Sequence, residues 1–309
     1  MKLLSIVFSF KNEQENINEL VRRVNEIVNK KLTIKKYELI FVDDCSSDDS
    51  LQVLLKLKKK YPIKIIRMSR TFGVTPCVLA GFKQSKGDAV IYMDCDLQDP
   101  PELLPLMVDK FLNGADVVHT IRTKRHGESF FKLLITKIAY KTINFFSEVP
   151  LVVNAGDFKL LSRRAVEHIL SINESDPYMR GLSVWIGFNQ CFLNYERNSR
   201  YKGKTHFSLL SNLNPVNEFL RGLTAFSVTP LYITFGIGFF GLFISIIIII
   251  YALITKFLGV ASPGSSSILI VMGLLFSINI LSIGILGIYV ARIYNQVKTR
   301  PRYIIDKIY

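Results

Sequence analysis

Three carboxylates follow an apolar run in the stretch AVIYMDCDLQDPPELL, residues 89–104: Asp94, Asp96 and Asp99. In an extended chain, residues two apart point the same way, so Asp94 and Asp96 are expected to address one ion together. Mg²⁺ and Mn²⁺ take hard oxygen ligands, usually one or two carboxylates plus the phosphates of a substrate. Gln98 can add a carbonyl oxygen. The spacing therefore predicts a divalent-metal site that a phosphate-bearing molecule completes.

Further acids follow two other predicted strands. Asn12 and Glu13 come after LLSIVFSF, and Asp43 and Asp44 end YELIFVDD. A single acid after a strand is usually a helix cap, but acids after three strands of one sheet converge on one edge. Convergent carboxylates repel each other unless a cation lies among them. This convergence supports the metal site predicted from the Asp94 region.

The elements that must position these acids alternate regularly. Continuous apolar runs predict four strands, at residues 3–10, 37–44, 63–69 and 88–94. The segments between them predict three helices, at residues 17–32, 46–61 and 75–87, and Gly87 is expected to close the last helix. Pro100 and Pro101 are expected to start the next helix, with Glu102 in its first turn. Strands that are apolar on both faces and separated by helices predict an α/β fold with a doubly wound, mostly parallel sheet. In such sheets ligands bind beyond the carboxyl ends of the strands.

Two long apolar segments follow this domain. No charged residue occurs between Arg221 and Lys256 or between Lys256 and Arg292. Leu231–Ile254 and Ile268–Val290 are each long enough to cross ~30 Å of hydrocarbon as a helix, and buried core helices are the alternative. The segment from Arg292 onward has five Lys and Arg against one acid, and no signal-peptide pattern precedes the first strand. Both ends are therefore expected on the cytoplasmic side of a membrane.

The expected division is a domain at 1–210, a juxtamembrane amphipathic segment at 211–228, two transmembrane helices at 229–291 and a basic cytoplasmic tail at 292–309. The formal charge of +14 could suit nucleic acid. In a chain with two predicted transmembrane helices, it is better explained by binding to anionic lipid headgroups and phosphorylated substrates. Four scattered cysteines without a CxxC pair are expected to be reduced core residues. The four histidines lack metal-ligand spacing.

Seven motifs occur in an order typical of one enzyme family: FSFKNEQENI, FVDDCSSDDS, SRTFGVTPCVLAGF, DCDLQDPPE, NAGDFKLLSRR, RGLSVWIGF and RNSRYKGKTHF. With them, residues 1–210 resemble a family 2 glycosyltransferase of the GT-A fold. The whole chain, with its two apolar helices, resembles the polyisoprenyl-phosphate glycosyltransferases, in particular the bactoprenol glucosyltransferase group. Dolichol-phosphate-mannose synthase is a more distant relative of this pattern.

The resemblance implies a role for each matching position. The metal would be held by Asp94, Asp96 and Gln98, and the nucleotide sugar by Ser9, Glu13, Asp43, Asp44 and Asp94. Asp157 matches the acid proposed as catalytic base, and Asp96 is the second catalytic acid. The acceptor phosphate would meet Arg122, Lys132, Thr136 and Arg200. The chain departs from the family pattern at Ser9 and Lys11, which bears on base recognition, and at Thr71 and Val74, which bears on polar contacts. At Lys132 it has a point charge in place of the bidentate guanidinium of a frequent Arg.

The reaction implied is the inverting, metal-dependent transfer of a sugar to membrane polyprenyl (undecaprenyl) phosphate, with Mg²⁺ or Mn²⁺ as cofactor. Glucose from UDP-glucose is the expected donor, and the product would supply lipid-linked sugar for cell-surface glycan modification at the bacterial inner membrane. A homo-oligomer and a flippase partner are left open. The alternatives are a processive polymer synthase and a non-enzymatic membrane module that binds lipid phosphate or scaffolds a flippase. The intact DCDLQ and GDF motifs favour an enzyme.

Several segments keep two interpretations. Asp157 is either a base or a group that orients the sugar or a basic partner, because a phosphate acceptor is largely ionised at pH 7. SFFKLLITKIAYKTINFF, residues 129–146, is a core helix or an interfacial helix, and Pro215–Phe226 is a second interfacial candidate. Tyr201–Phe207 is a lid or a surface turn. Trp185 contacts a sugar or packs in the core.

Overall fold

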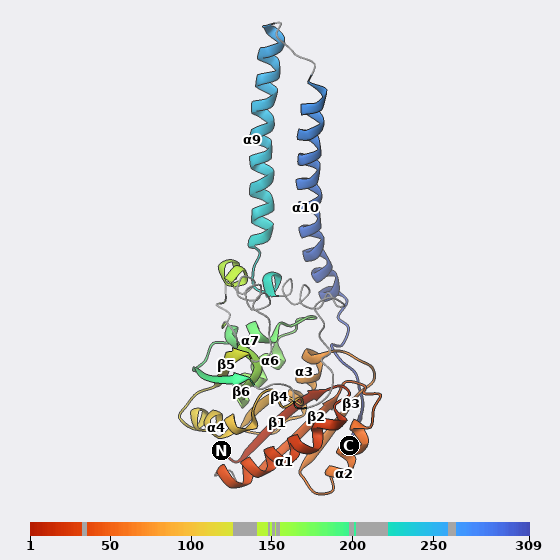
Figure 1. The fold of residues 1–309 in the computed structure, drawn as a ribbon, viewed down its shortest axis with the longest axis vertical. Coiled ribbons are helices and arrows are strands. Elements are labelled where there is room, and N and C mark those ends of the chain that lie inside the picture. Colours follow the sequence, from red (N-terminus) through yellow and green to blue (C-terminus); the bar gives the residue numbers. More distant parts are fainter. Residues whose placement is uncertain are drawn as a thin grey trace.

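The computed structural model describes residues 1–32, 36–125, 141–147, 149, 152, 155–197, 201, 222–258 and 264–309. These residues form an α/β domain built on one sheet and a long helical hairpin that extends away from it (Figure 1). The acids that follow the predicted strands, among them Asp43, Asp44, Asp94 and Asp96, belong to the α/β domain. The hairpin forms the second region of the molecule.

The first half of the sheet is parallel. It contains β1 (Leu3–Phe10), β2 (Lys36–Asp43), β3 (Ile63–Met68) and β4 (Ala89–Asp94), separated by α1 (Gln14–Lys31), α2 (Ser50–Leu57) and α3 (Val74–Gln84). Strand β1 lies between β2 and β4 and is parallel to both, and β2 is parallel to β3. This alternation confirms the predicted doubly wound arrangement. The carboxyl ends of β1, β2 and β4 therefore meet at one edge.

The second half of the sheet mixes strand directions. After η1 (Pro101–Leu103) and α4 (Leu104–Leu112) come β5 (Val117–Arg125), β6 (Ala155–Ser162), α6 (Arg163–Ser171), α7 (Met179–Trp185) and β7 (Gln190–Arg197). Strand β6 is antiparallel to β4 and β5, whereas β7 is parallel to β5. The order is β7-β5-β6-β4-β1-β2-β3-β8. Four of the seven pairings are parallel, so the sheet is mostly parallel, and the start of η1 at Pro101 confirms the predicted helix start.

Both faces of the sheet are buried, as continuous apolar strands require. Along β1, Ile6 and Phe8 face the core layer that contains α1 and α4, while Val7 faces the layer that contains α3 and α6. Phe8 stacks on Phe41 of β2 at 4.6 Å between ring centroids. The alternation fixes the register, because a shift by one residue would exchange the two faces. A fixed register in turn fixes which residues reach the carboxyl edge.

The predicted end of the third helix is wrong. Helix α3 ends at Gln84, and Ser85 is already extended. A Cβ added at Gly87 would lie 2.6 Å from the Ser5 nitrogen and 2.7 Å from the Ala89 oxygen. Gly87 is therefore needed for close backbone approach to β1 and does not close the helix.

The hairpin consists of α9 (Thr229–Phe257) and α10 (Ser265–Val297). By length and composition, Thr229–Ile248 and Leu274–Val297 could each cross a membrane, and neither stretch is buried inside the molecule. Large apolar side chains such as Phe239, Phe240 and Leu281 point outward. The alternative of buried core helices is therefore wrong.

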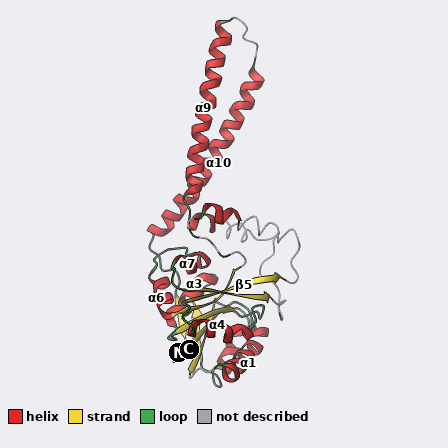
Figure 2. Cartoon of the chain, turned by 90° about the vertical axis from the view of Figure 1, so that its left-hand side faces the viewer, coloured by secondary structure: helices red, strands yellow, loops and turns green. Residues whose placement is uncertain are grey.

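The chain returns to the sheet after the hairpin. Strand β8 (Ile305–Ile308) pairs antiparallel with β3 at the sheet edge. The Ser69 nitrogen donates to the Ile304 oxygen at 3.1 Å, and the Tyr309 nitrogen donates to the Ile65 oxygen at 2.8 Å. The basic tail predicted at 292–309 did not include this strand. Because β1 and β8 belong to one sheet, both ends of the hairpin connect to the same domain, and Figure 2 shows the hairpin extending from one end of that domain.

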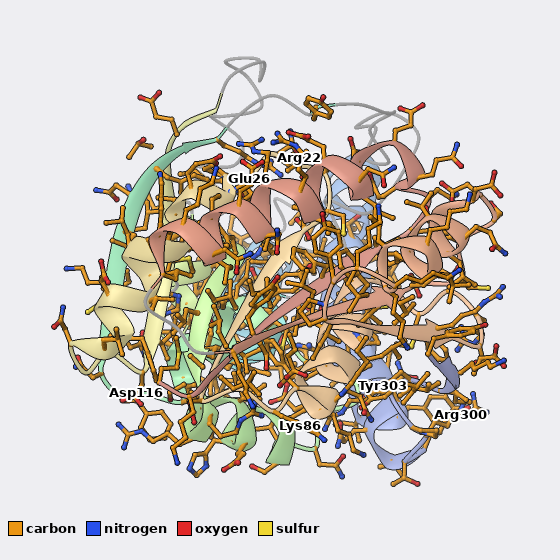
Figure 3. All side chains as sticks on the ribbon, turned by 90° about the horizontal axis from the view of Figure 1, so that it is seen from below. Arg22, Glu26, Lys86, Asp116, Arg300 and Tyr303 are labelled. Atoms are coloured by element: carbon orange, nitrogen blue, oxygen red, sulfur yellow. The ribbon has the colours of Figure 1, made fainter. Side chains whose placement is uncertain are left out.

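Figure 3 shows the side chains of the molecule from the end opposite the hairpin. On α1, Arg22 pairs with Glu26 at 2.7 Å. Asp116 and Lys86 lie elsewhere on this view, and Arg300 and Tyr303 mark the corner where the chain returns from α10.

Candidate active site

A chain of hydroxyl groups connects β1 to the first acid after β4. Ser9 and Asp94 are register partners on adjacent strands. The Ser9 Oγ lies 2.8 Å from the Tyr92 Oη, and the Tyr92 hydroxyl donates to Asp94 Oδ1 at 2.6 Å. Sequence reasoning missed Tyr92, although its position two residues before Asp94 in a strand places both on one face. Ser9 therefore contacts the acidic edge through Tyr92.

Asp94 carries charge that its surroundings do not balance. Burial raises the pKa of Asp94 to about 7, and the negative charges of Asp96 and Asp99 contribute to the increase. The hydrogen bond from Tyr92 has the opposite effect and lowers the pKa of Asp94, but it does not outweigh burial and the neighbouring acids. A carboxylate in this state gains stability from any cation that approaches it.

The reasoning that placed Asp94 and Asp96 in one extended chain is wrong. Strand β4 ends at Asp94, and residues 95–97 form a turn in which Leu97 has a φ of 60°. Cys95 and Leu97 bury their side chains in the core. The Asp96 Oδ1 accepts a hydrogen bond from the Gln98 nitrogen at 3.1 Å. Asp96 is thus presented by a tight turn whose apolar residues fix it to the sheet.

Asp43 and Asp44 end β2 and have different surroundings. Asp43 is fully buried; its Oδ1 accepts from the Ser46 nitrogen at 2.8 Å, and burial raises its pKa. Its Oδ2 has no hydrogen-bond partner among the described residues. The Asp44 carboxylate accepts from the Phe72 and Gly73 nitrogens at 2.7 and 2.9 Å. Asp44 therefore holds the loop after β3, where Gly73 has a φ of 95° that favours glycine.

Glu13 lies at the start of α1 and is buried. Its Oε2 accepts from the Asn16 Nδ2 at 2.6 Å, and its backbone nitrogen donates to Ser50 Oγ at 2.9 Å. The neighbouring Asn12 has a φ of 57° and accepts from the Ser47 nitrogen. These contacts tie the loop after β1 to the loop after β2. The structure thus brings Ser9, Glu13, Asp43, Asp44 and Asp94 to one edge.

Asp157, on β6, is paired with a residue that the sequence analysis did not select. Arg180 of α7 donates from Nη2 to Asp157 Oδ2 at 2.7 Å and from Nε to Oδ1 at 3.2 Å. Burial favours the neutral acid, but the charges of Arg180, Lys159 and Arg122 lower the pKa of Asp157 below its usual range. Burial also lowers the pKa of Lys159 to about 8, and its Nζ donates to Ser183 Oγ at 2.9 Å. Asp157 is therefore a charged group and a weak base.

Arg122, on β5, is largely enclosed by protein. Its side chain is 11% exposed, and its Nη2 lies 3.6 Å from Asp99 Oδ1. The Arg122 Nε donates to the Tyr195 hydroxyl at 3.0 Å. A Cβ added at Gly156 would lie 2.6 Å from the Arg122 Nη2, so the guanidinium lies against the backbone beside Asp157. Arg122 thus joins the loop after β4 to β6.

The residues present fit a divalent ion held by few protein ligands. Among the described residues, no group of three or more His, Cys, Asp or Glu side chains is arranged to hold a metal. A site completed by substrate phosphates needs only one or two carboxylates. The unbalanced charge at Asp94, beside Asp96, supplies such a donor set. Three expected acceptor residues, Lys132, Thr136 and Arg200, lie outside the described residues, as does most of Tyr201–Phe207.

The site is connected to the base of the hairpin. A Cβ at Gly181, the residue after Arg180, would lie 2.0 Å from Phe226 Cε2, which shows how tightly α7 packs on the segment before α9. In that segment, Thr224 accepts from Arg292 Nη1 at 2.7 Å and the Ser227 oxygen accepts from the Tyr289 hydroxyl at 2.7 Å. Asp157 is therefore one helix away from the apolar hairpin.

Trp185 ends α7 and is 58% exposed, so the core-packing interpretation is wrong.

All four cysteines are free, as expected, and Cys77 and Cys95 are buried. In the helix at 141–146, Ile143 packs with Tyr178 whereas Phe145 is exposed. This segment therefore has both a packed and an open face.

The mixed sheet and its acidic carboxyl edge define an α/β enzyme domain, and comparison with known proteins gives its class. The sequence model of Glycosyl transferase family 2 matches residues 5–170. A glycosyltransferase of Synechocystis sp. is 36% identical over 99% of this chain and 95% of its own. The SfII prophage-derived bactoprenol glucosyl transferase of Shigella flexneri is 34% identical over 98% of this chain and 97% of its own. Among solved structures, S. aureus TarS 1–349 in complex with UDP-GlcNAc overlaps 72% of this chain and 65% of its own, with 17% identity and a TM-score of 0.48.

The chain belongs to glycosyl transferase family 2. It is a glycosyltransferase with the mostly parallel α/β sheet that its motifs predict, followed by two apolar helices. Membership in this family decides against the non-enzymatic membrane module considered from the sequence.

Proposed function

We propose that this glycosyltransferase transfers a sugar, most simply glucose from UDP-glucose, to the phosphate of a membrane polyprenyl lipid. The reaction depends on Mg²⁺ or Mn²⁺ and inverts the anomeric carbon. Its product supplies lipid-linked sugar for cell-surface glycan modification. The name of the Shigella flexneri relative, bactoprenol glucosyl transferase, supports this choice of acceptor and sugar.

One structural observation carries the proposal: the continuous contact from Asp157 through Arg180 and α7 to the base of the hairpin. An acceptor that is soluble in water would need no such connection. A polyprenyl phosphate has its tail in hydrocarbon and its phosphate at the surface. The segment that packs on α7 leads directly into α9, so an apolar anchor enters the membrane next to the site.

On the donor side, the residues of the carboxyl edge bind and orient the nucleotide sugar. Asp94 and Asp96, with Gln98, would hold the divalent ion, and Ser9, Glu13, Asp43 and Asp44 would surround the nucleoside. When bound, the ion neutralises the negative charge that develops on the departing diphosphate. Tyr92 holds the Asp94 carboxylate in place through its hydroxyl. Asp44 fixes the loop at Phe72 and Gly73 that borders this pocket.

On the acceptor side, the chemistry needs cations more than a base. A phosphate monoester is largely ionised at pH 7, so its oxygen can attack without first losing a proton. Asp157 holds Arg180 in a two-point contact and has a lowered pKa. Of its two roles, orientation of a basic partner or of the sugar is therefore favoured over proton abstraction. Arg122, Lys132, Thr136 and Arg200 would receive the lipid phosphate.

The sheet supports the proposed topology. Strand β8, after the hairpin, joins the same sheet as β1, before it, which supports a hairpin whose two ends lie on the same side of a bilayer. The nucleotide sugar is a cytoplasmic metabolite, so that side is the cytoplasm, and the protein is a multi-pass protein of the bacterial inner membrane. A homo-oligomer and a flippase partner remain predictions from the family resemblance.

The test is transfer by membranes that contain the full chain. They would be incubated with polyprenyl phosphate and each of several radiolabelled nucleotide sugars, and the organic phase would be counted. Label from UDP-glucose in the organic phase, lost with EDTA and restored by Mg²⁺ or Mn²⁺, is the expected result. Label from another nucleotide sugar alone would replace glucose, and no label from any donor would overturn the lipid acceptor. Membranes without the protein are the control.

A further inference from the structure

Tyr195, on β7, bridges two charged groups that lie far apart in sequence. Its hydroxyl accepts from Arg122 Nε at 3.0 Å and donates to Asp99 Oδ1. Burial and the nearby Asp99 charge raise the pKa of Tyr195, so the hydroxyl keeps the proton that it donates. Neither Tyr195 nor Asp99 has a role in the proposed reaction so far.

Asp99 is the buried anchor of this cluster. It is 1% exposed, and its Oδ1 faces Arg122 at 3.6 Å and Arg197 Nε at 3.8 Å. Its Oδ2 has no hydrogen-bond partner among the described residues. A buried carboxylate is costly unless positive groups surround it, so Asp99 requires both arginines close by. It also follows the Asp94–Gln98 loop directly, which ties the cluster to the donor side.

Arg122 is thereby held in one orientation. Its Nε is fixed by Tyr195, its Nη2 faces Asp99, and the same end of the guanidinium lies against Gly156. Arg122 is close enough to Asp157 to contribute to lowering the pKa of that acid. The long side chain of Arg122 is therefore restrained on two sides, and it lies beside Asp157, which pairs with Arg180 of α7.

We propose that Asp99 and Tyr195 are positioning residues that fix the Arg122 guanidinium against Gly156 as the cation that receives the acceptor phosphate. This inference rests on the proposed function, because it assigns the cluster to the acceptor side of the same reaction. A guanidinium held in advance loses less conformational entropy when the phosphate arrives. The cluster also links acceptor binding to the Asp94–Gln98 loop through Asp99.

Tyr195→Phe is the first variant, since it removes one hydroxyl and keeps the ring. We expect kcat/KM for polyprenyl phosphate to fall roughly tenfold, while the calorimetric affinity for UDP-glucose stays within about twofold. Tyr37→Phe is the matched control, because it removes the hydroxyl that donates to Asn25, away from the site. Gly156→Ala should reproduce the loss by displacing the guanidinium without removing any polar group.

The decisive measurement is a double-mutant cycle. In an Arg122→Ala background, Tyr195→Phe should cause no further loss, because it acts through Arg122. A purely structural role would give an added loss in that background and a lowered Tm, and this result would overturn the inference. Unchanged acceptor kinetics in Tyr195→Phe, or weakened UDP-glucose binding, would also overturn it. If the unaltered protein transfers sugar to polyprenyl phosphate and Tyr195→Phe does so equally well, the inference alone fails; if neither transfers, the proposed function fails.

Discussion

The candidate active site has two halves, one at the parallel strands β1–β4 and one at the mixed strands β5–β7. They differ in whether a positively charged side chain pairs with their carboxylates. In the parallel half, Asp94 ends β4 with a hydroxyl partner, and burial and neighbouring acids raise its pKa to about 7. In the mixed half, Asp157 pairs with Arg180 and its pKa is lowered, and Arg122 faces Asp99 of the loop after β4. Among the described residues, Asp94 thus has no arginine partner, whereas Asp157 has one.

This difference supports the division of binding that we propose for the two halves. Carboxylates that the protein leaves unbalanced favour a cation from outside, which a metal ion supplies together with the diphosphate of the donor. Carboxylates that are balanced by arginine serve to orient those arginines. The resulting cations can then receive a second anion, the acceptor phosphate. Each prediction below would break or sharpen this division.

The largest effect is expected at the acids that follow β4. Asp96→Ala should lower transfer by roughly a hundredfold or more, because it removes a ligand of the ion that stabilises the leaving group. Transfer to polyprenyl phosphate and membrane insertion would both be measured, and EDTA should reproduce the loss. Asp109→Ala, on the exposed face of α4, is the control. Near-normal turnover of Asp96→Ala would remove the metal from the parallel half.

Replacing Arg122 or Arg200 by alanine should lower kcat/KM for the lipid roughly ten- to a hundredfold, the value of a charge-assisted contact. Arg180→Ala should cause a similar loss, since it leaves Asp157 unpaired. Arg164→Ala, which removes the exposed partner of the buried Asp116 away from the site, is the matched control. Calorimetry should find nucleotide binding little changed. Weakened nucleotide binding with normal lipid kinetics would assign these arginines to the donor instead.

Stability should respond to pH with opposite signs in the two halves when metal is removed. The folded-state pKa of Asp94 is raised from 3.8 to about 7, so its contribution is present below pH 3.8 and is lost as pH rises through 7. The folded-state pKa of Asp157 is lowered, so its contribution is present above 3.8 and is lost in acid. At pH 8 in EDTA, Asp94→Asn should therefore stabilise the protein, by roughly 1–3 kcal/mol, and Asp157→Asn should destabilise it. Thermal unfolding followed by circular dichroism measures both, and equal signs would contradict the comparison.

The smallest effect is expected at Lys132. Lys132→Ala should raise the KM for polyprenyl phosphate only about threefold to tenfold, because a flexible ammonium makes one point contact where a guanidinium makes two. Lys132→Arg should restore or exceed the original affinity. Initial rates over a range of lipid concentrations would show both changes. A loss at Lys132→Ala as large as that of Arg122→Ala would mean that the phosphate contacts are equivalent.

The parallel half could be predicted from the sequence because each strand is a continuous apolar run that ends in an acid. The mixed half could not, since its contacts join distant residues: Tyr195 and Asp99 are 96 residues apart. Arg180 gave no signal beyond its motif, and its pairing with Asp157 depends on how α7 packs on β6. The turn at residues 95–97 was missed because apolar Cys95 and Leu97 continue the alternation of the strand. Strand β8 was missed because its edge position leaves most of it exposed.

Strand β8 also sets an order of events during synthesis. It is translated after α9 and α10, so β3 has an open edge for as long as the hairpin is being made. An unpaired edge strand can pair with other chains and aggregate. The edge is closed only when β8 has followed the hairpin out of the ribosome and reached the sheet at Ile65 and Ser69. Completion of the catalytic sheet therefore follows synthesis of the apolar hairpin, and a chain interrupted within α10 lacks the strand that protects β3.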